Sequence, residues 1–168
     1  MSLSHISPDY LAGVLDQSLT IQTRYSNGNL KIRGSIHGHR SLLSFIQSLV
    51  GGSVSSYKNT TLNLYGQDVI VLARYLKSTS SLLQLSYQVL CDIDDTKKSF
   101  ISNQSDPVAH QQKIASLKII FADAYSQRLT QETHPSSIPY SAGHVEASSW
   151  LSVGLNRKTL FNACLMTN

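Results

Sequence analysis

The chain is poor in charge and in cysteine. Charged residues make up 14% of its 168 residues, against roughly a quarter in an average soluble domain. Cys91 and Cys164 form neither a disulfide framework nor a metal-binding spacing, which favours two buried thiols in a reduced compartment. No apolar run approaches the length of a membrane span, and the first residues are too polar for a signal peptide. We therefore expect a soluble intracellular protein, whose compartment the sequence leaves open.

The remaining bulk properties narrow the class further. The length suffices for one domain with its own core. Serine and threonine fill much of the surface that charged residues leave. The net charge of +4 makes an anionic partner plausible without establishing one, because many inert domains are as basic.

A short phrase occurs twice. Tyr-Leu-Ala-Gly-Val-Leu-Asp-Gln-Ser at residues 10–18 returns as Tyr-Ser-Ala-Gly-His-Val-Glu-Ala-Ser at residues 140–148. Each copy has a proline just before it, Pro8 and Pro139. Chance is one explanation, since Ala-Gly is common in helices. A repeated segment more naturally indicates a duplicated supersecondary unit.

Periodicity and turn signals predict the elements around these phrases. A helix should begin at Ser7-Pro8 and end near Gln17. Two alternating runs around Asn27-Gly28 then form a hairpin. The spacing further predicts helices over residues 41–50, 67–77 and 81–92, strands over 53–58 and 60–65, and a long helix over 108–130. Residues 92–107 have the least ordered composition, and 133–139 form a linker. A last hairpin, 149–155 with 159–165, follows the second phrase.

Alternation divides the side chains of the first hairpin between two faces. Leu19, Ile21, Leu30 and Ile32 point toward a core. The opposite face carries three cations and no anion: Thr20, Gln22, Arg24, Lys31, Arg33 and Ser35. An ordinary solvated face explains this pattern, and so does contact with a nucleic acid. His37-Gly38-His39 is interpreted as a turn, since a pair of histidines lacks a third metal ligand.

The Leu-Ala-Gly-Val-Leu-Asp run of the first phrase, followed by a hairpin and then helix, hairpin and helix, resembles the LAGLIDADG homing endonuclease family. The resemblance covers the first unit well and the chain end in part. It implies an α+β fold, with one αββαββα unit, a truncated second unit and an antiparallel sheet packed on helices. The units would comprise residues 1–96 and 140–168, joined by a linker with one long helix, 97–139, in one compact domain. The two motif helices would pack through their small residues: Ala12, Gly13, Ala142, Gly143 and Ala147.

Both copies of the phrase differ from the family's motif at the position that the resemblance links to metal binding and cleavage. The eighth motif residue, the metal-binding acid of the family, is Ser18 in the first copy and Ser148 in the second. A neutral hydroxyl is a poor ligand for the divalent ions that such cleavage requires. Asp16 and Glu146 remain, but two residues correspond to about 200° around a helix. A structural carboxylate is therefore preferred over a catalytic one.

The resemblance thus implies a protein that binds double-stranded DNA and has impaired cleavage, for example a remnant of an intron-encoded enzyme. The resemblance implies that eight residues contact DNA: Gln22, Arg24, Lys31, Arg33, Ser35, Lys58, Arg157 and Lys158. Two alternatives remain: an active endonuclease that uses Asp16 and Glu146, and an interaction protein without a nucleic-acid role. No cofactor is expected, except Mg²⁺ if the protein cleaves DNA. The bare edge of an incomplete sheet also allows a homodimer.

Overall fold

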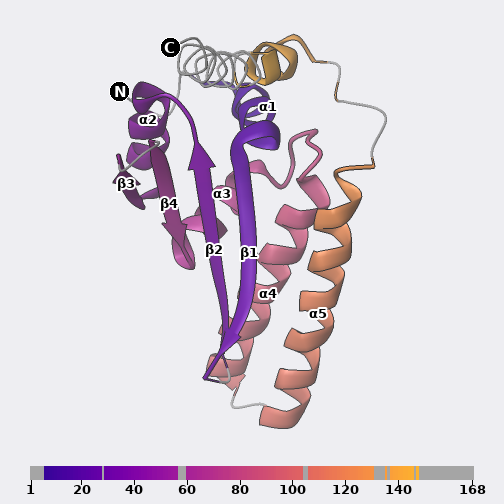
Figure 1. The fold of residues 1–168 in the computed structure, drawn as a ribbon. Helices are drawn as coiled ribbons and strands as arrows, with labels where there is room; N and C mark the ends of the chain where they lie inside the picture. The colour runs from indigo at the N-terminus through magenta and orange to yellow at the C-terminus, as the bar shows by residue number, and fades with distance from the viewer. Residues whose placement is uncertain are drawn as a thin grey trace, which may run out of the picture.

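The computed structural model describes residues 6–27, 29–56, 60–103, 106–130, 135, 137–145 and 147. Along the chain it consists of α1 (Pro8–Ser18), β1 (Leu19–Ser26), β2 (Asn29–His37), α2 (Arg40–Val50), β3 (Ser53–Ser55), β4 (Thr61–Tyr65), α3 (Gln67–Leu76), α4 (Gln84–Asn103) and α5 (Pro107–Gln127). A further helix, here called the second-phrase helix, covers residues 138–145. In Figure 1 it lies beside α1, at the opposite end of the molecule from the connection between α4 and α5.

The predicted order of helix, hairpin, helix, hairpin and helix is confirmed through α3. Pro8 stands in the first turn of α1, where its missing N–H is not needed. Five consecutive residues of α1, Leu11 to Leu15, are buried. The helix ends where Leu19 adopts an extended conformation, so that α1 leads directly into β1.

The four strands form one antiparallel sheet in the order β1-β2-β4-β3. Asn27 adopts a positive φ of 53° in the turn between β1 and β2, a conformation that asparagine tolerates better than most residues. The register pairs Leu19 with Ile36 at one end of the hairpin and Arg24 with Lys31 toward the other. This register sends the two sets of alternating side chains to the faces that the sequence predicts for them.

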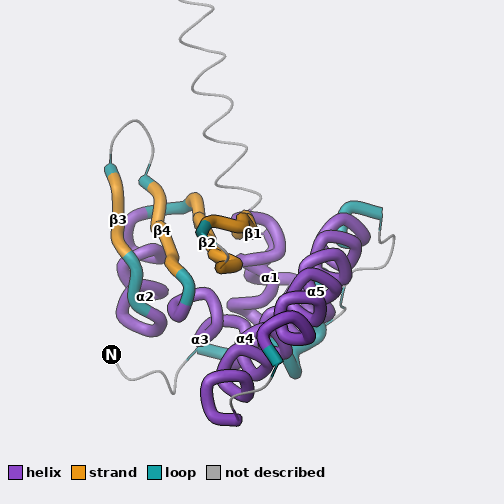
Figure 2. The backbone as a smooth tube through the Cα atoms, turned by 90° about the horizontal axis from the view of Figure 1, so that it is seen from below, coloured by secondary structure: helices purple, strands orange, loops and turns teal. Residues whose placement is uncertain are grey.

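The described helices that pack on the sheet contact the same face. Figure 2 shows the strands as one layer, with α2, α3 and α4 on one side of it. The buried side chains of that face meet apolar residues of the helices, and each fully buried aliphatic side chain contributes about 1.5–3 kcal/mol. The strands supply Leu19, Ile21, Leu30, Ile32, Ile36, Leu62 and Leu64 to this core, and the helices supply Leu15, Leu72, Leu76, Tyr87, Leu90 and Ile93.

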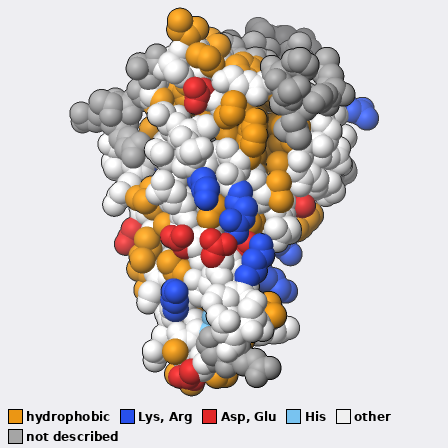
Figure 3. All heavy atoms as spheres, turned by 180° about the vertical axis from the view of Figure 1, so that it is seen from behind, with side chains coloured by type: hydrophobic (Ala, Val, Ile, Leu, Met, Phe, Trp, Pro, Cys, Tyr) orange, Lys and Arg blue, Asp and Glu red, His pale blue; other side chains and the backbone are white. Residues whose placement is uncertain are grey.

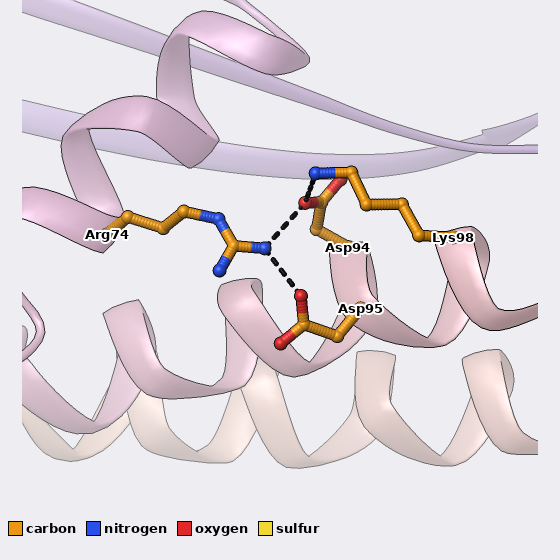
Figure 4. A network of polar contacts seen from close by, with 4 residues as sticks. All are labelled: Arg74, Asp94, Asp95 and Lys98. Carbon is orange, nitrogen blue, oxygen red and sulfur yellow. Dashed lines mark hydrogen bonds and ion pairs between the residues drawn. The ribbon is translucent and has the colours of Figure 1, made fainter.

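The prediction that residues 92–107 are the least ordered was wrong for most of that stretch. Helix α4 does not end near Asp92 but continues to Asn103. Packing against α5 accompanies this continuation, and ion pairs neutralise its charges: Asp94 binds Arg74 of α3 at 2.8 Å and Lys98 at 2.7 Å, while Asp95 binds Arg74 at 2.5 Å (Figure 4). Burial alone would raise the pKa of Asp94. The hydrogen bonds from Lys98 and Arg74 outweigh that effect and hold its pKa below the ordinary value.

The helical side of the molecule carries charges of both signs. Figure 3 shows acidic and basic side chains intermingled on the face seen from behind. Within the part of the chain that the structure describes, no helix is long and apolar enough to cross a membrane.

Candidate functional site

The outer face of the sheet gathers the predicted polar residues into one surface. The register pairs Gln22 with Arg33 and Arg24 with Lys31 across β1 and β2. All four of these side chains are exposed, and Ser35 is half-buried beside them. The four strands contain no acidic residue at any position. The charges that the strands contribute to this surface are therefore all positive and lie on β1 and β2, unlike the mixed charges of the helical side.

Strand β4 extends this surface with residues that the sequence analysis did not single out. Tyr65 lies opposite Arg33, and Asn63 lies opposite Ser35. The Arg33 guanidinium stands 5.8 Å from the centroid of the Tyr65 ring, a cation–π distance. A shallow hollow of about 210 Å³ lies among Thr20, Gln22, Arg33, Asn63 and Tyr65. The alternation of Thr61 to Tyr65 was the signal that could have identified them.

His37 also belongs to the outer face, because it follows Ser35 by two residues in β2. Its Nδ1 lies 3.0 Å from the Thr61 hydroxyl. His39 lies just beyond the strand and caps α2, where its Nδ1 accepts a hydrogen bond from the Ser41 backbone N–H. Each imidazole thus has a structural partner on one ring nitrogen.

At the end of the sheet near α1, the two copies of the phrase meet backbone to backbone. A Cβ added to Gly13 would overlap the backbone carbonyl oxygen of Tyr140 and lie 3.0 Å from the backbone nitrogen of His144. A Cβ added to Gly143 would overlap the carbonyl oxygen of Tyr10 in the same way. Only glycine permits this approach. Ala12 and Ala147 are buried near the contact, whereas Ala142 is exposed.

The carboxylate of Asp16 holds three segments together. It accepts hydrogen bonds from the Ser81 hydroxyl at 2.6 Å, the Leu82 N–H at 2.8 Å and the Tyr140 hydroxyl at 2.6 Å. Burial raises the pKa of Asp16, and the hydrogen bonds offset part of that rise. Burial, followed by the bond to Asp16, raises the pKa of the Tyr140 hydroxyl as well. Asp16 thereby ties α1 to the segment before α4 and to the second-phrase helix.

Ser18 stands where the resemblance places the family's metal-binding acid. Its side chain is buried, and its hydroxyl donates to the Val14 carbonyl oxygen at 2.8 Å. A cavity of about 100 Å³ beside it contains no carboxylate in its lining of Val14, Ser18, His37, Gly38, His39, Ser41, Leu42 and Ala147. Nowhere among the described residues do three or more His, Cys, Asp or Glu side chains gather as they would around a metal ion. The donors present here do not fit a Mg²⁺ site, which takes carboxylate and other oxygen ligands.

The other predicted site residues lie outside the described part of the chain. Lys58, Arg157 and Lys158 belong to this group, as do Ser148 and the side chain of Glu146. The predicted hairpin after the second phrase lies there too. Their predicted roles stay predictions.

Comparison with known proteins finds likeness only at the level of structure. No family model matches the chain, and no curated protein sequence matches it. The LAGLIDADG homing endonuclease I-GzeII in complex with its DNA target superposes with a TM-score of 0.60 at 14% identity, over 83% of this chain and 58% of that one. The LAGLIDADG meganuclease I-AabMI bound to uncleaved DNA gives 0.59 at 18%, over 84% and 57%. The homing endonuclease I-CvuI, solved with the I-CreI target, gives 0.52 at 13%, over 85% and 93%.

This chain therefore spans less than three fifths of the first two of these proteins and nearly all of the third. The likeness agrees with the resemblance carried by the repeated phrase, with its paired glycines at the contact between α1 and the second-phrase helix. The chain has the fold of the LAGLIDADG homing endonucleases.

Proposed function

We propose that this protein binds duplex DNA through the outer face of its sheet and is impaired in cleaving it. The observation that carries the proposal is the exposed group of Arg24, Lys31 and Arg33 on a sheet face that no described helix covers and no strand acid neutralises. The structures that share this fold include complexes with DNA targets.

The geometry of that face suits a DNA groove. The major groove admits a two-stranded β-ribbon, and arginine and glutamine are side chains that read guanine and adenine edges. Gln22 and Arg33 lie opposite each other in the middle of the ribbon, where base edges would be met. Arg24 and Lys31 lie nearer its turn, where they would contact phosphates.

Salt-dependent binding tests this proposal. Fluorescence anisotropy with a random-sequence duplex should show affinity that falls steeply with salt. Replacing Arg24 or Lys31 by alanine should each reduce the slope of log affinity against log salt concentration by about 0.9, the value for one phosphate contact. Replacing Arg33 by alanine should lower the affinity. Lys77→Ala and Lys113→Ala, exposed substitutions on α3's end and on α5, serve as matched controls with unchanged slopes. Equal slopes for all five variants would contradict DNA binding through this face, and no DNA binding would favour an interaction protein without a nucleic-acid role.

The proposal of impaired cleavage is based on the serine at position 18 and on the hydrogen bonds that Asp16 accepts inside the protein. A carboxylate that already accepts three hydrogen bonds inside the protein is a poor candidate for a metal ligand at the DNA surface. The I-CvuI structure contains uncleaved DNA in the presence of magnesium, so Mg²⁺ would be the metal if this protein cleaves. We expect no nicking of supercoiled plasmid in Mg²⁺ or Mn²⁺. Nicking that Asp16→Asn abolishes in a folded variant would instead establish the active endonuclease.

A further inference from the structure

A second cavity lies away from the contact between the two phrases. It has a volume of about 410 Å³ and sits where the turn end of the first hairpin meets the C-terminal part of α4 and the first turns of α5. Figure 1 shows these three segments converging at the lower end of the molecule. The volume lies within the range of about 300–1,000 Å³ that small-molecule sites occupy.

The cavity walls are mainly apolar and aromatic. Leu30, Ile101 and Ile114 supply aliphatic surface, and Tyr25, Phe100 and His110 supply rings. Phe100 and His110 stack with centroids 4.1 Å apart and planes 18° from parallel. The ammonium group of Lys118 stands 4.8 Å from the centroid of the Tyr25 ring. These flat, mutually supported surfaces favour a planar ligand.

Lys97 is the one residue with a permanent charge in this lining. Its half-buried ammonium group donates to the Leu30 carbonyl oxygen at 2.7 Å. Among the residues that the structure describes, it forms no ion pair, because Asp94 is held by Arg74 and Lys98. Desolvation lowers the pKa of Lys97, with partial compensation by Asp94. An ammonium group has three donors, so Lys97 has donors left for an anion.

We propose that this cavity binds a small planar aromatic acid, with its carboxylate on the Lys97 ammonium group and its ring along the Phe100–His110 wall. A neutral aromatic ligand would leave the half-buried charge of Lys97 without an ion-pair partner in the cavity. A carboxylate would neutralise it and gain a charge-assisted hydrogen bond. This site is separate from DNA binding and holds whether or not the sheet contacts DNA.

The test compares 2-naphthoate with its neutral analogue 2-naphthamide by isothermal titration calorimetry. We expect 2-naphthoate to bind at least about tenfold more tightly, the lower end for a hydrogen bond to a charged group. Lys97→Met should bring the two affinities within about twofold of each other, while Lys113→Met should preserve the preference. Lys113 is the matched control, since it is exposed on α5 and is absent from the cavity lining.

Amide and side-chain NMR shifts locate the binding. Signals of Phe100, Ile101 and His110 should move on addition of 2-naphthoate. No binding, equal affinities for the two probes, shifts elsewhere, or an intact preference in Lys97→Met would each overturn the proposal. If circular dichroism shows that Lys97→Met does not fold, Lys97→Gln takes its place with the same expected loss. DNA affinity measured on the same samples shows separately whether the proposed function stands.

Discussion

Replacing Gly143 by alanine adds one methyl group to the contact between the two phrases. At an exposed helical position this change would stabilise the helix by about 1 kcal/mol, because alanine has the higher helix propensity. Here the new Cβ would overlap the carbonyl oxygen of Tyr10 and lie 3.1 Å from the Val14 nitrogen. Both atoms belong to the backbone of α1, so no side-chain rotation relieves the overlap.

The overlap should outweigh the propensity gain. Overpacking of a well-packed contact costs about 1–3 kcal/mol, and a rigid backbone neighbour places this case toward the upper end. With about 1 kcal/mol returned by propensity, we expect Gly143→Ala to lose about 2 kcal/mol. The loss should appear as weaker docking of the second-phrase helix on α1.

Two measurements on the full chain test this expectation. Urea denaturation gives the change in the free energy of unfolding, and amide hydrogen exchange over residues 138–145 reports docking of the helix itself. Ser141→Ala is the control, because Ser141 is exposed on the same helix and its replacement should change stability by less than about 0.5 kcal/mol. If Gly143→Ala is as stable as Ser141→Ala, the close approach of the two helices does not exist as described.

Three further changes probe polar contacts between the helices. Tyr140→Phe removes the hydroxyl that donates to Asp16 and should cost about 1.5–3 kcal/mol of unfolding free energy in urea, as for other hydrogen bonds to charged groups; exposed Tyr75→Phe should cost little. Because the pKa of Asp16 is raised in the folded protein, its contribution to stability is greatest below its unfolded pKa and falls as pH rises through the folded pKa. The wild-type advantage over Asp16→Asn should therefore shrink from acid toward neutral pH, and an advantage that grows over that range contradicts the assignment. Arg74→Met removes two ion pairs to α4, and since Arg74 is partly exposed we expect a loss of about 1 kcal/mol or less in thermal denaturation.

Local pattern was sufficient for the elements that carry the proposed DNA surface. The alternation from Leu19 to Ile36 and the Asn27-Gly28 turn fix both the hairpin and the face to which each side chain points. A strand has a side-chain period of two, so a single buried face determines the other. The same rule applied to β4 would have added Asn63 and Tyr65.

Other features depended on partners distant in sequence. Composition predicts the least order for residues 92–107, yet Arg74 of another helix pairs with the carboxylates of Asp94 and Asp95. No periodicity within α4 reveals that pairing. The position of Lys97 in a cavity wall likewise depends on tertiary packing, because its ammonium group binds the Leu30 carbonyl of β2.

The repeated phrase illustrates what residue identity determines and what requires the tertiary structure. The sequence alone determined that small residues stand at matching positions in both copies and that serine stands at Ser18 and Ser148, where the resemblance implies an acid. Those statements concern residue identity, which needs no coordinates. Only the tertiary structure decided what Asp16 does, because its donors Ser81 and Tyr140 lie 65 and 124 residues away in sequence. A hydrogen bond depends on distance in space, and folding alone brings these groups within 3 Å of one another.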